Sequence, residues 1–143
     1  MNNIAIVYWS GTGNTEAMAQ AIAEGVREAG ASAALLQSSE FCAGRLNEFQ
    51  AVAFGCPAMG DEVLEETEFA PMFESLESDL AGRRLALFGS YGWGDGEWMR
   101  SWESVCREKG AVLLHDEGLI ANEVPDDEAV DACKALGREL AAW

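Results

Sequence analysis

Short apolar runs that alternate with amphipathic helical segments constrain the fold of this chain more than any other feature. Runs of strand length occupy residues 4–8, 33–36, 51–55 and 85–89. The first run has no charged residue, which is typical of a parallel strand that is covered on both faces. After the first run, Met18, Ile22, Val26 and Ala29 recur at helical spacing. The pattern predicts an α/β fold with a doubly wound parallel sheet and helices on both faces.

The later segments continue the same pattern. Apolar positions at helical spacing predict a helix over residues 69–80, and Asp95 is a candidate N-cap for the helix that follows residue 95. Residues 111–114 and 119–121 are expected to be two pieces of a fifth strand, and a last helix is expected over residues 126–142. A chain of 143 residues without an evident linker suits one domain, covering residues 1–143.

The charge of the chain excludes several classes of partner. There are 25 acidic and 9 basic residues, which give a formal net charge of −16. Such a surface repels nucleic acid and anionic membranes. It can attract basic protein surfaces, but charge alone does not distinguish this role from solubility or adaptation to salt. No apolar run approaches the roughly 20 residues that a membrane span needs, and no secretory leader is evident. The four cysteines are widely spaced and are expected to be free thiols, so we expect a cytoplasmic protein.

Ligands of doubly wound sheets bind beyond the carboxyl ends of the strands, so the loops after the first, third and fourth runs are candidate sites. The first loop consists of glycines and hydrogen-bond donors: Ser10, Gly11, Thr12, Gly13, Asn14 and Thr15. Successive amides here can form an anion nest, and the following helix N-terminus adds favourable partial charge. Because the first basic residue in the chain is Arg27, this loop is expected to hold a phosphate with neutral donors.

Two better-known phosphate loops are excluded by the residues present. The loop has no Gly-Lys-Ser/Thr ending, so it is not the loop of a nucleotide triphosphatase. Glu16 stands where the dinucleotide fingerprint requires a third glycine. A phospho-accepting receiver domain shares this architecture, but acidic residues are missing directly after the first and third runs.

The other two loops offer flexible and aromatic surfaces. The second loop comprises Pro57, Ala58, Met59, Gly60, Asp61 and Glu62, and the Gly60–Asp61 peptide could turn over at low cost. The third loop comprises Ser90, Tyr91, Gly92, Trp93, Gly94 and Asp95, of which the first five are candidate binding residues. A tryptophan between two glycines is suited to stack on a flat aromatic ring. Together the three loops predict a site for a phosphorylated planar aromatic group, against the alternative of ordinary polar turns.

These loops resemble those of the flavodoxin family, in the right order and at the right spacing. The segment Tyr-Trp-Ser-Gly-Thr-Gly-Asn-Thr at residues 8–15 looks like the flavodoxin phosphate signature. Residues 58–62 and 89–94 resemble the two flavin loops of short-chain flavodoxins from anaerobic bacteria. The resemblance spans essentially the whole chain and implies a flavodoxin-like five-stranded parallel sheet of order 2-1-3-4-5, with non-covalently bound FMN as the cofactor.

The resemblance also implies roles for individual residues. The first loop would hold the FMN phosphate. Met59 and Trp93 would cover the two faces of the flavin ring, Glu62 would accept a hydrogen bond from flavin N3–H, and Gly60 would present its carbonyl to flavin N5–H. Backbone groups of Ser90 to Gly92 would contact the polar edge of the ring. Pro57 stands where some members carry a hydroxyl residue.

The implied function is that of an electron carrier and not an enzyme. We expect a low-potential carrier that shuttles between semiquinone and hydroquinone, because the flavin loops contain no basic residue to balance an anionic ring. The expected partners are larger oxidoreductases with basic docking patches, met transiently by a monomer. One alternative is an FMN-dependent reductase that acts on its own substrate. Another is a non-redox binder of phosphorylated metabolites, which would leave Met59 and Trp93 unexplained.

Overall fold

A parallel sheet forms the centre of the computed structural model, which describes residues 2–60 and 62–143. Its strands are β1 (Asn3–Tyr8), β2 (Ser32–Gln37), β3 (Ala51–Gly55), β4 (Arg84–Tyr91), β5 (Val112–Leu113) and β6 (Leu119–Asn122). All pairings are parallel. The order is β2-β1-β3-β4-β5, and β6 also pairs with β4. The predicted fold class and strand order are confirmed.

The edge strand beside β4 is divided into two pieces, as expected from the sequence. β5 is in register with Arg84 and Leu85 at the start of β4. β6 is in register with the other end of β4, from Phe88 to Tyr91. The chain leaves the sheet between the two pieces, where His115 adopts a positive φ of 66°. The interruption lets the second piece end at the same edge of the sheet as β1, β3 and β4.

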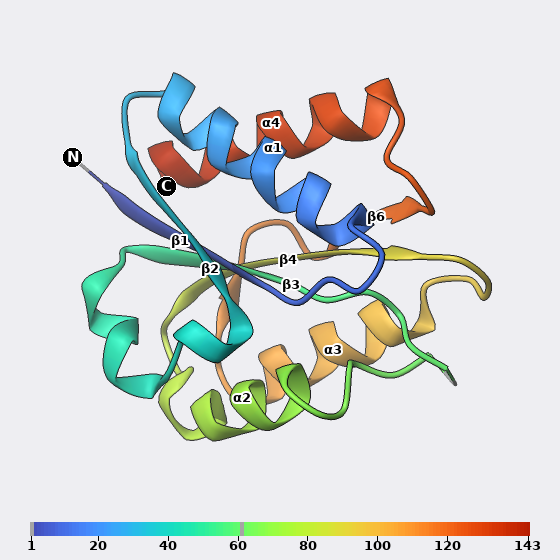
Figure 1. Ribbon diagram of the computed structural model, residues 1–143. Coiled ribbons are helices and arrows are strands. Elements are labelled where there is room, and N and C mark those ends of the chain that lie inside the picture. Colours follow the sequence, from blue (N-terminus) through green and yellow to red (C-terminus); the bar gives the residue numbers. More distant parts are fainter. Residues whose placement is uncertain (1, 61) are drawn as a thin grey trace.

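Helices cover both faces of the sheet (Figure 1). α1 (Asn14–Glu28) and α4 (Asp127–Ala142) lie on one face, and α2 (Phe69–Leu76) and α3 (Glu97–Glu108) lie on the other. The alternation along β1 supplies both cores, because Ile4 and Ile6 pack towards α1 and α4 whereas Ala5 and Val7 pack towards α2 and α3. This explains why the first apolar run contains no charged residue.

The structure adds to and corrects some local expectations. Between β2 and β3, where no element is predicted, the described residues form two 3₁₀ helices, η1 (Ser38–Glu40) and η2 (Ala43–Glu48). α2 ends at Leu76, and Leu80 is buried after a further 3₁₀ turn, η3 (Glu77–Asp79). The candidate N-cap Asp95 does not cap α3, since Gly96 occupies that position. The Asp95 carboxylate binds Arg100 instead, at 3.0 Å.

No helix in the described ranges is long and apolar enough to cross a membrane. The four cysteines are free, and three of them are buried, which agrees with the expectation of unpaired thiols.

Candidate functional site

A cleft of about 490 Å³ lies at the carboxyl ends of β1, β3 and β4, where the sequence predicts the site. All three predicted loops contribute to its lining. The lining residues are Trp9, Gly11, Thr12 and Asn14; Pro57, Ala58 and Met59; Ser90, Tyr91 and Gly92; and Glu123 and Val124. The last two follow β6, so a fourth loop also borders the cleft. The strand order therefore brings segments from distant parts of the sequence to one ligand-sized hollow.

The first loop presents unpaired amides at the N-terminus of α1. The Ser10 hydroxyl shapes the turn, because its Oγ accepts hydrogen bonds from the amides of Gly13 at 3.1 Å and Glu16 at 3.2 Å. Gly13 adopts a φ of 97°, a conformation that favours glycine. Among the described residues, no acceptor pairs with the amides of Gly11, Thr12, Asn14 and Thr15. These donors and the helix dipole suit an anion.

The first and third loops are joined by a buried pair of hydroxyls. Thr15 Oγ1 and Ser90 Oγ lie 2.7 Å apart, and the two residues are only 1% and 3% exposed. The Ser90 carbonyl in turn accepts a hydrogen bond from the Ala58 amide of the second loop at 3.0 Å. The two hydroxyls therefore fix the loops relative to one another. Their side chains are engaged within the protein, which leaves the backbone amide of Thr15 for a ligand.

The second loop is closed by a pair of backbone hydrogen bonds. The amide of Met59 binds the carbonyl of Val63 at 2.9 Å, and the amide of Val63 binds the carbonyl of Met59 at 3.1 Å. Gly60 is exposed at the tip with a φ of 43°, and Glu62 also has a positive φ of 58°. Asp61 lies outside the described residues. Gly60 thus lies exposed beside a base that two hydrogen bonds fix, and a movable Gly60 carbonyl requires such a base.

Glu65 anchors the base of the second loop, and sequence reasoning missed it. Its carboxylate accepts hydrogen bonds from the amides of Thr67 at 2.8 Å, Glu68 at 2.7 Å and Phe69 at 2.9 Å, and also from the Thr67 hydroxyl. Burial raises the pKa of the Glu65 carboxyl, but the hydrogen bonds outweigh burial and lower the pKa to about 2. Glu65 therefore remains a carboxylate and caps the start of α2.

The third loop combines an exposed tryptophan with a close contact to the second loop. Trp93 is 66% exposed, which is unusual for so large an apolar side chain. Gly94 has a φ of 88°, and a Cβ atom there would lie 2.5 Å from Cδ of Glu62. The Asn122 side chain donates to the carbonyls of Tyr91 at 3.2 Å and Gly92 at 3.3 Å. The loop backbone is therefore held from two sides while the Trp93 ring stays free.

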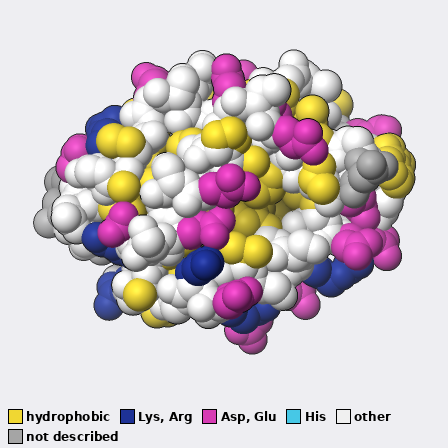
Figure 2. Space-filling model, turned by 90° about the horizontal axis from the view of Figure 1, so that it is seen from below, with side chains coloured by type: hydrophobic (Ala, Val, Ile, Leu, Met, Phe, Trp, Pro, Cys, Tyr) yellow, Lys and Arg dark blue, Asp and Glu magenta, His cyan; other side chains and the backbone are white. Residues whose placement is uncertain are grey.

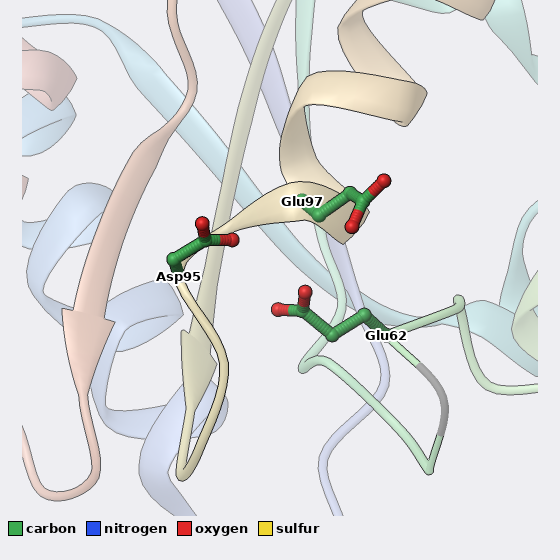
Figure 3. A group of neighbouring side chains, drawn as sticks. All are labelled: Glu62, Asp95 and Glu97. Atoms are coloured by element: carbon green, nitrogen blue, oxygen red, sulfur yellow. The ribbon is translucent and has the colours of Figure 1, made fainter.

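Three carboxylates gather beside the third loop (Figure 3). Glu62 comes from the loop after β3, whereas Asp95 and Glu97 come from the segment that leads into α3, and their oxygens lie within 4.8 Å of one another. Arg100 adds a positive charge to this cluster. Its guanidinium donates hydrogen bonds to the carboxylate and to the carbonyl of Asp95, each at 3.0 Å. The expectation of no basic residue in the flavin loops holds for the loops themselves. It overlooked Arg100, which reaches the site from α3.

Glu62 carries an acceptor that the protein does not use. Its Oε1 atom is buried and has no hydrogen-bond partner among the described residues. A buried carboxylate oxygen without a donor is uncommon and points to a donor on a ligand. Together with the unpaired amides of the first loop and the exposed Trp93 ring, this acceptor fits a phosphorylated, flat aromatic group that carries an N–H.

The structure assembles most, but not all, of the predicted residues around one cleft. Ser10, Gly13 and Thr15 support the first loop from behind, and Gly60, Trp93 and Gly94 lie outside the lining. Glu62 lines a neighbouring groove between α2 and α3. Glu123 and Val124 were missed because only three loops were considered. The rule that ligands bind at the carboxyl ends of strands, applied to the last strand as well, would have found them.

Fold and site together define an α/β protein whose cleft suits a phosphorylated, flat aromatic ligand. The flavodoxin family model matches residues 6–136. The chain is 45% identical to the flavodoxin of Clostridium beijerinckii over 136 residues, which cover 95% of this chain and 97% of that one. It is 42% identical to the flavodoxin of Megasphaera elsdenii over 138 residues, covering 96% and 98%.

A solved structure agrees with these sequence relatives. The solution structure of two-electron reduced Megasphaera elsdenii flavodoxin superimposes with a TM-score of 0.87 at 41% identity, covering 98% of this chain and 99% of that one. The chain belongs to the flavodoxin family, whose members are FMN-binding electron-transfer proteins. The expected family, cofactor and carrier function are confirmed.

Proposed function

We propose that this chain is a single FMN-binding domain that holds its cofactor in the cleft at the carboxyl ends of β1, β3 and β4. The observation that carries the assignment of residues is the set of unpaired amides in the first loop, next to the α1 N-terminus. The phosphate would be bound by the amides of Gly11, Thr12, Asn14 and Thr15. The hydroxyls of Ser10 and Thr15 would act by fixing the loop.

The flavin ring would be bound by the second and third loops. Bound FMN supplies one-electron chemistry, and the protein supplies orientation and electrostatics. Met59 and Trp93 would contact the two faces of the ring, and the unused Glu62 Oε1 would accept the flavin N3–H. Gly60 and Asp61 would provide the peptide that turns towards flavin N5. Backbone groups of Tyr91 and Gly92, held by Asn122, would meet the polar edge.

The charges around this site favour a low potential. Glu62, Asp95 and Glu97 oppose added negative charge, and Arg100 offsets one of them. The net charge of −16 acts in the same direction. We propose a monomeric carrier that cycles between its one-electron and two-electron reduced forms and docks transiently on basic patches of larger oxidoreductases. Free thiols fit a reducing compartment such as the cytoplasm.

The phosphate assignment is tested by comparing FMN with riboflavin, which lacks the phosphate. Flavin fluorescence is titrated with the apoprotein at fixed salt. If the first loop holds the phosphate, FMN binds at least about 100-fold more tightly than riboflavin, since several charge-assisted hydrogen bonds are lost without it. Equal affinities would contradict the assignment.

The proposed docking on basic patches is tested by the salt dependence of electron transfer. Transfer to a basic c-type cytochrome is expected to slow as ionic strength rises.

A further inference from the structure

A second hollow of about 390 Å³ lies between α2 and α3. We call it the α2–α3 groove. Its floor is apolar and is formed by Ala70, Phe73, Trp102 and Val105. Figure 2 shows this face of the molecule, where hydrophobic side chains gather in a hollow that has acidic side chains beside it. The groove is separate from the proposed phosphate cleft, with which it shares no lining residue.

One buried donor in this groove has no acceptor. Trp102 is only 2% exposed, and its indole Nε1 has no hydrogen-bond partner in the described part of the chain. Trp98, one turn earlier on α3 and equally buried, donates its Nε1–H to the Cys56 carbonyl at 3.1 Å. The Trp102 ring also lies edge-on to the rings of Phe69 and Phe73, with centroids 5.4 and 5.6 Å apart, so this indole belongs to the apolar floor of the groove.

The rim of the groove carries unneutralised negative charge. Glu62, Glu66 and Glu74 line it, and no Lys or Arg among residues 2–60 and 62–143 lies within ion-pair distance of these three. Glu77, which also lines the groove, does have a cation partner, since Lys109 Nζ lies 3.8 Å from its Oε1. The groove therefore combines an apolar floor with a rim that attracts cations. Such a combination fits a segment with an apolar side chain and a neighbouring basic residue.

We propose that the α2–α3 groove is a docking site for a basic protein segment of a redox partner. A leucine-like side chain of that segment packs on the apolar floor of the groove, and a lysine or arginine of the same segment faces Glu66 and Glu74. Glu62 and Val63 join this groove to the second loop, and Val63 is 40% exposed at that junction. A segment docked here lies next to the proposed flavin site. The inference rests on the proposed carrier function, which requires such a partner.

The test follows the indole N–H signals by ¹H–¹⁵N spectroscopy of the FMN-loaded protein. The probe is the dipeptide acetyl-leucyl-arginine amide, and its neutral match is acetyl-leucyl-glutamine amide. The signals of Trp98 and Trp102, which both line the groove, are expected to shift saturably with the basic probe, and the signal of Trp143, which follows α4 on the other face of the sheet, is expected to stay in place. No shift at Trp102, or an equal shift at Trp143, would overturn the proposal. A Trp102 shift on concentrating the protein alone would overturn it in favour of a second copy.

Two variants of equal net charge separate the groove from general attraction. Glu66→Gln with Glu74→Gln removes two rim charges. Glu108→Gln with Asp131→Asn removes two exposed charges elsewhere, so both change the net charge from −16 to −14. The rim variant is expected to bind the basic probe about fivefold more weakly, and the control less than twofold. Equal losses would overturn the proposal.

Flavin absorbance in the same samples distinguishes failure of the docking site from failure of the proposed function. Loss of the Trp102 response with FMN still bound overturns the docking site and leaves the proposed function standing. A Trp102 response in a protein that binds no FMN overturns the proposed function and still supports a peptide site in the groove.

Discussion

The carboxylate of Glu62 occupies the space that a Cβ atom of residue 94 would need, so the second and third loops meet without room for a side chain at Gly94. Gly94 also has a φ of 88°, which a residue with a Cβ atom adopts only with strain. The contact sets the position of the unused Glu62 oxygen relative to the third loop. The position of Glu62 in the second loop therefore depends on which residue stands at position 94 in the third loop.

Gly94→Ala is expected to displace Glu62 and weaken FMN binding, by about tenfold or more, because the acceptor for flavin N3–H moves. Strain at the positive φ should lower the free energy of unfolding of the apoprotein by about 1 kcal/mol or more. Flavin fluorescence titration and urea unfolding measure the two effects. Gly44→Ala is the matched control, since its Cβ would meet only Cys42 Sγ at 3.9 Å. An unchanged FMN affinity in Gly94→Ala would contradict the role given to this contact.

Thr15 and Ser90 are expected to act as a unit. Thr15→Val leaves the buried Ser90 hydroxyl without its partner, at a cost of about 1–3 kcal/mol in the free energy of unfolding. Ser90→Ala likewise leaves the buried Thr15 Oγ1 without its hydrogen-bond partner. The double variant should therefore lose less than the sum of the single losses, by about 0.5 kcal/mol or more, in urea unfolding of the apoprotein. Strict additivity would show that the two hydroxyls do not interact.

Glu65 is expected to give the fold a pH-dependent stability. The pKa of its carboxyl is about 2 in the folded chain against an ordinary value of 4.5. Because the folded pKa is the lower one, the stabilisation is complete above about pH 4.5 and is lost as the pH falls through 2. Glu65→Gln places an amide N–H₂ among N–H donors and should cost about 2 kcal/mol near neutral pH.

The pH profile distinguishes this effect from a general loss of stability. Urea unfolding between pH 6 and pH 2.5 should show a smaller decline for Glu65→Gln than for the unaltered protein, because the variant has no carboxylate to protonate at this position. Glu66→Gln, which changes the exposed neighbour, is the control and should follow the unaltered profile. Parallel profiles for Glu65→Gln and the unaltered protein would contradict the assignment.

Arg100 is expected to raise the potential of the second electron. Its bond to Asp95 offsets one charge in the cluster of Glu62, Asp95 and Glu97. Arg100→Gln should therefore lower the midpoint potential for full reduction, and the difference should shrink as salt is added. Spectroelectrochemical titration measures it. Arg107→Gln, which removes a cation further along α3, is the control, and an equal shift in both variants would show only a net-charge effect.

Much of the fold could be predicted because the local signals agreed with one another. The uncharged first run required a strand that is covered on both faces, and Ile4 and Ala5 do face opposite cores. The two pieces of the last strand were predicted from the gap between their apolar runs. The segment between β2 and β3 could not be predicted as two 3₁₀ turns, because its buried residues, such as Phe41 and Leu46, have no clear period.

Site residues could be predicted where a loop has an unusual composition. They were missed where the role of a side chain depends on its contacts in the folded chain. Glycines and hydroxyls marked the first loop, and the glycines around Trp93 marked the third. Glu65 was missed because its carboxylate binds amides in the turn that follows it, and one acidic residue among many gives no sequence signal. Arg100 was missed because its partner Asp95 was interpreted as a helix cap.

The most direct test of the account is the visible absorption spectrum of the FMN-loaded protein during stepwise anaerobic reduction with dithionite. A carrier of single electrons is expected to be yellow, to turn blue as the first electron is taken up, and to bleach with the second. A yellow protein that bleaches without the blue stage would contradict one-electron transfer and favour a reductase. A protein that stays colourless after incubation with FMN would contradict the flavin site itself.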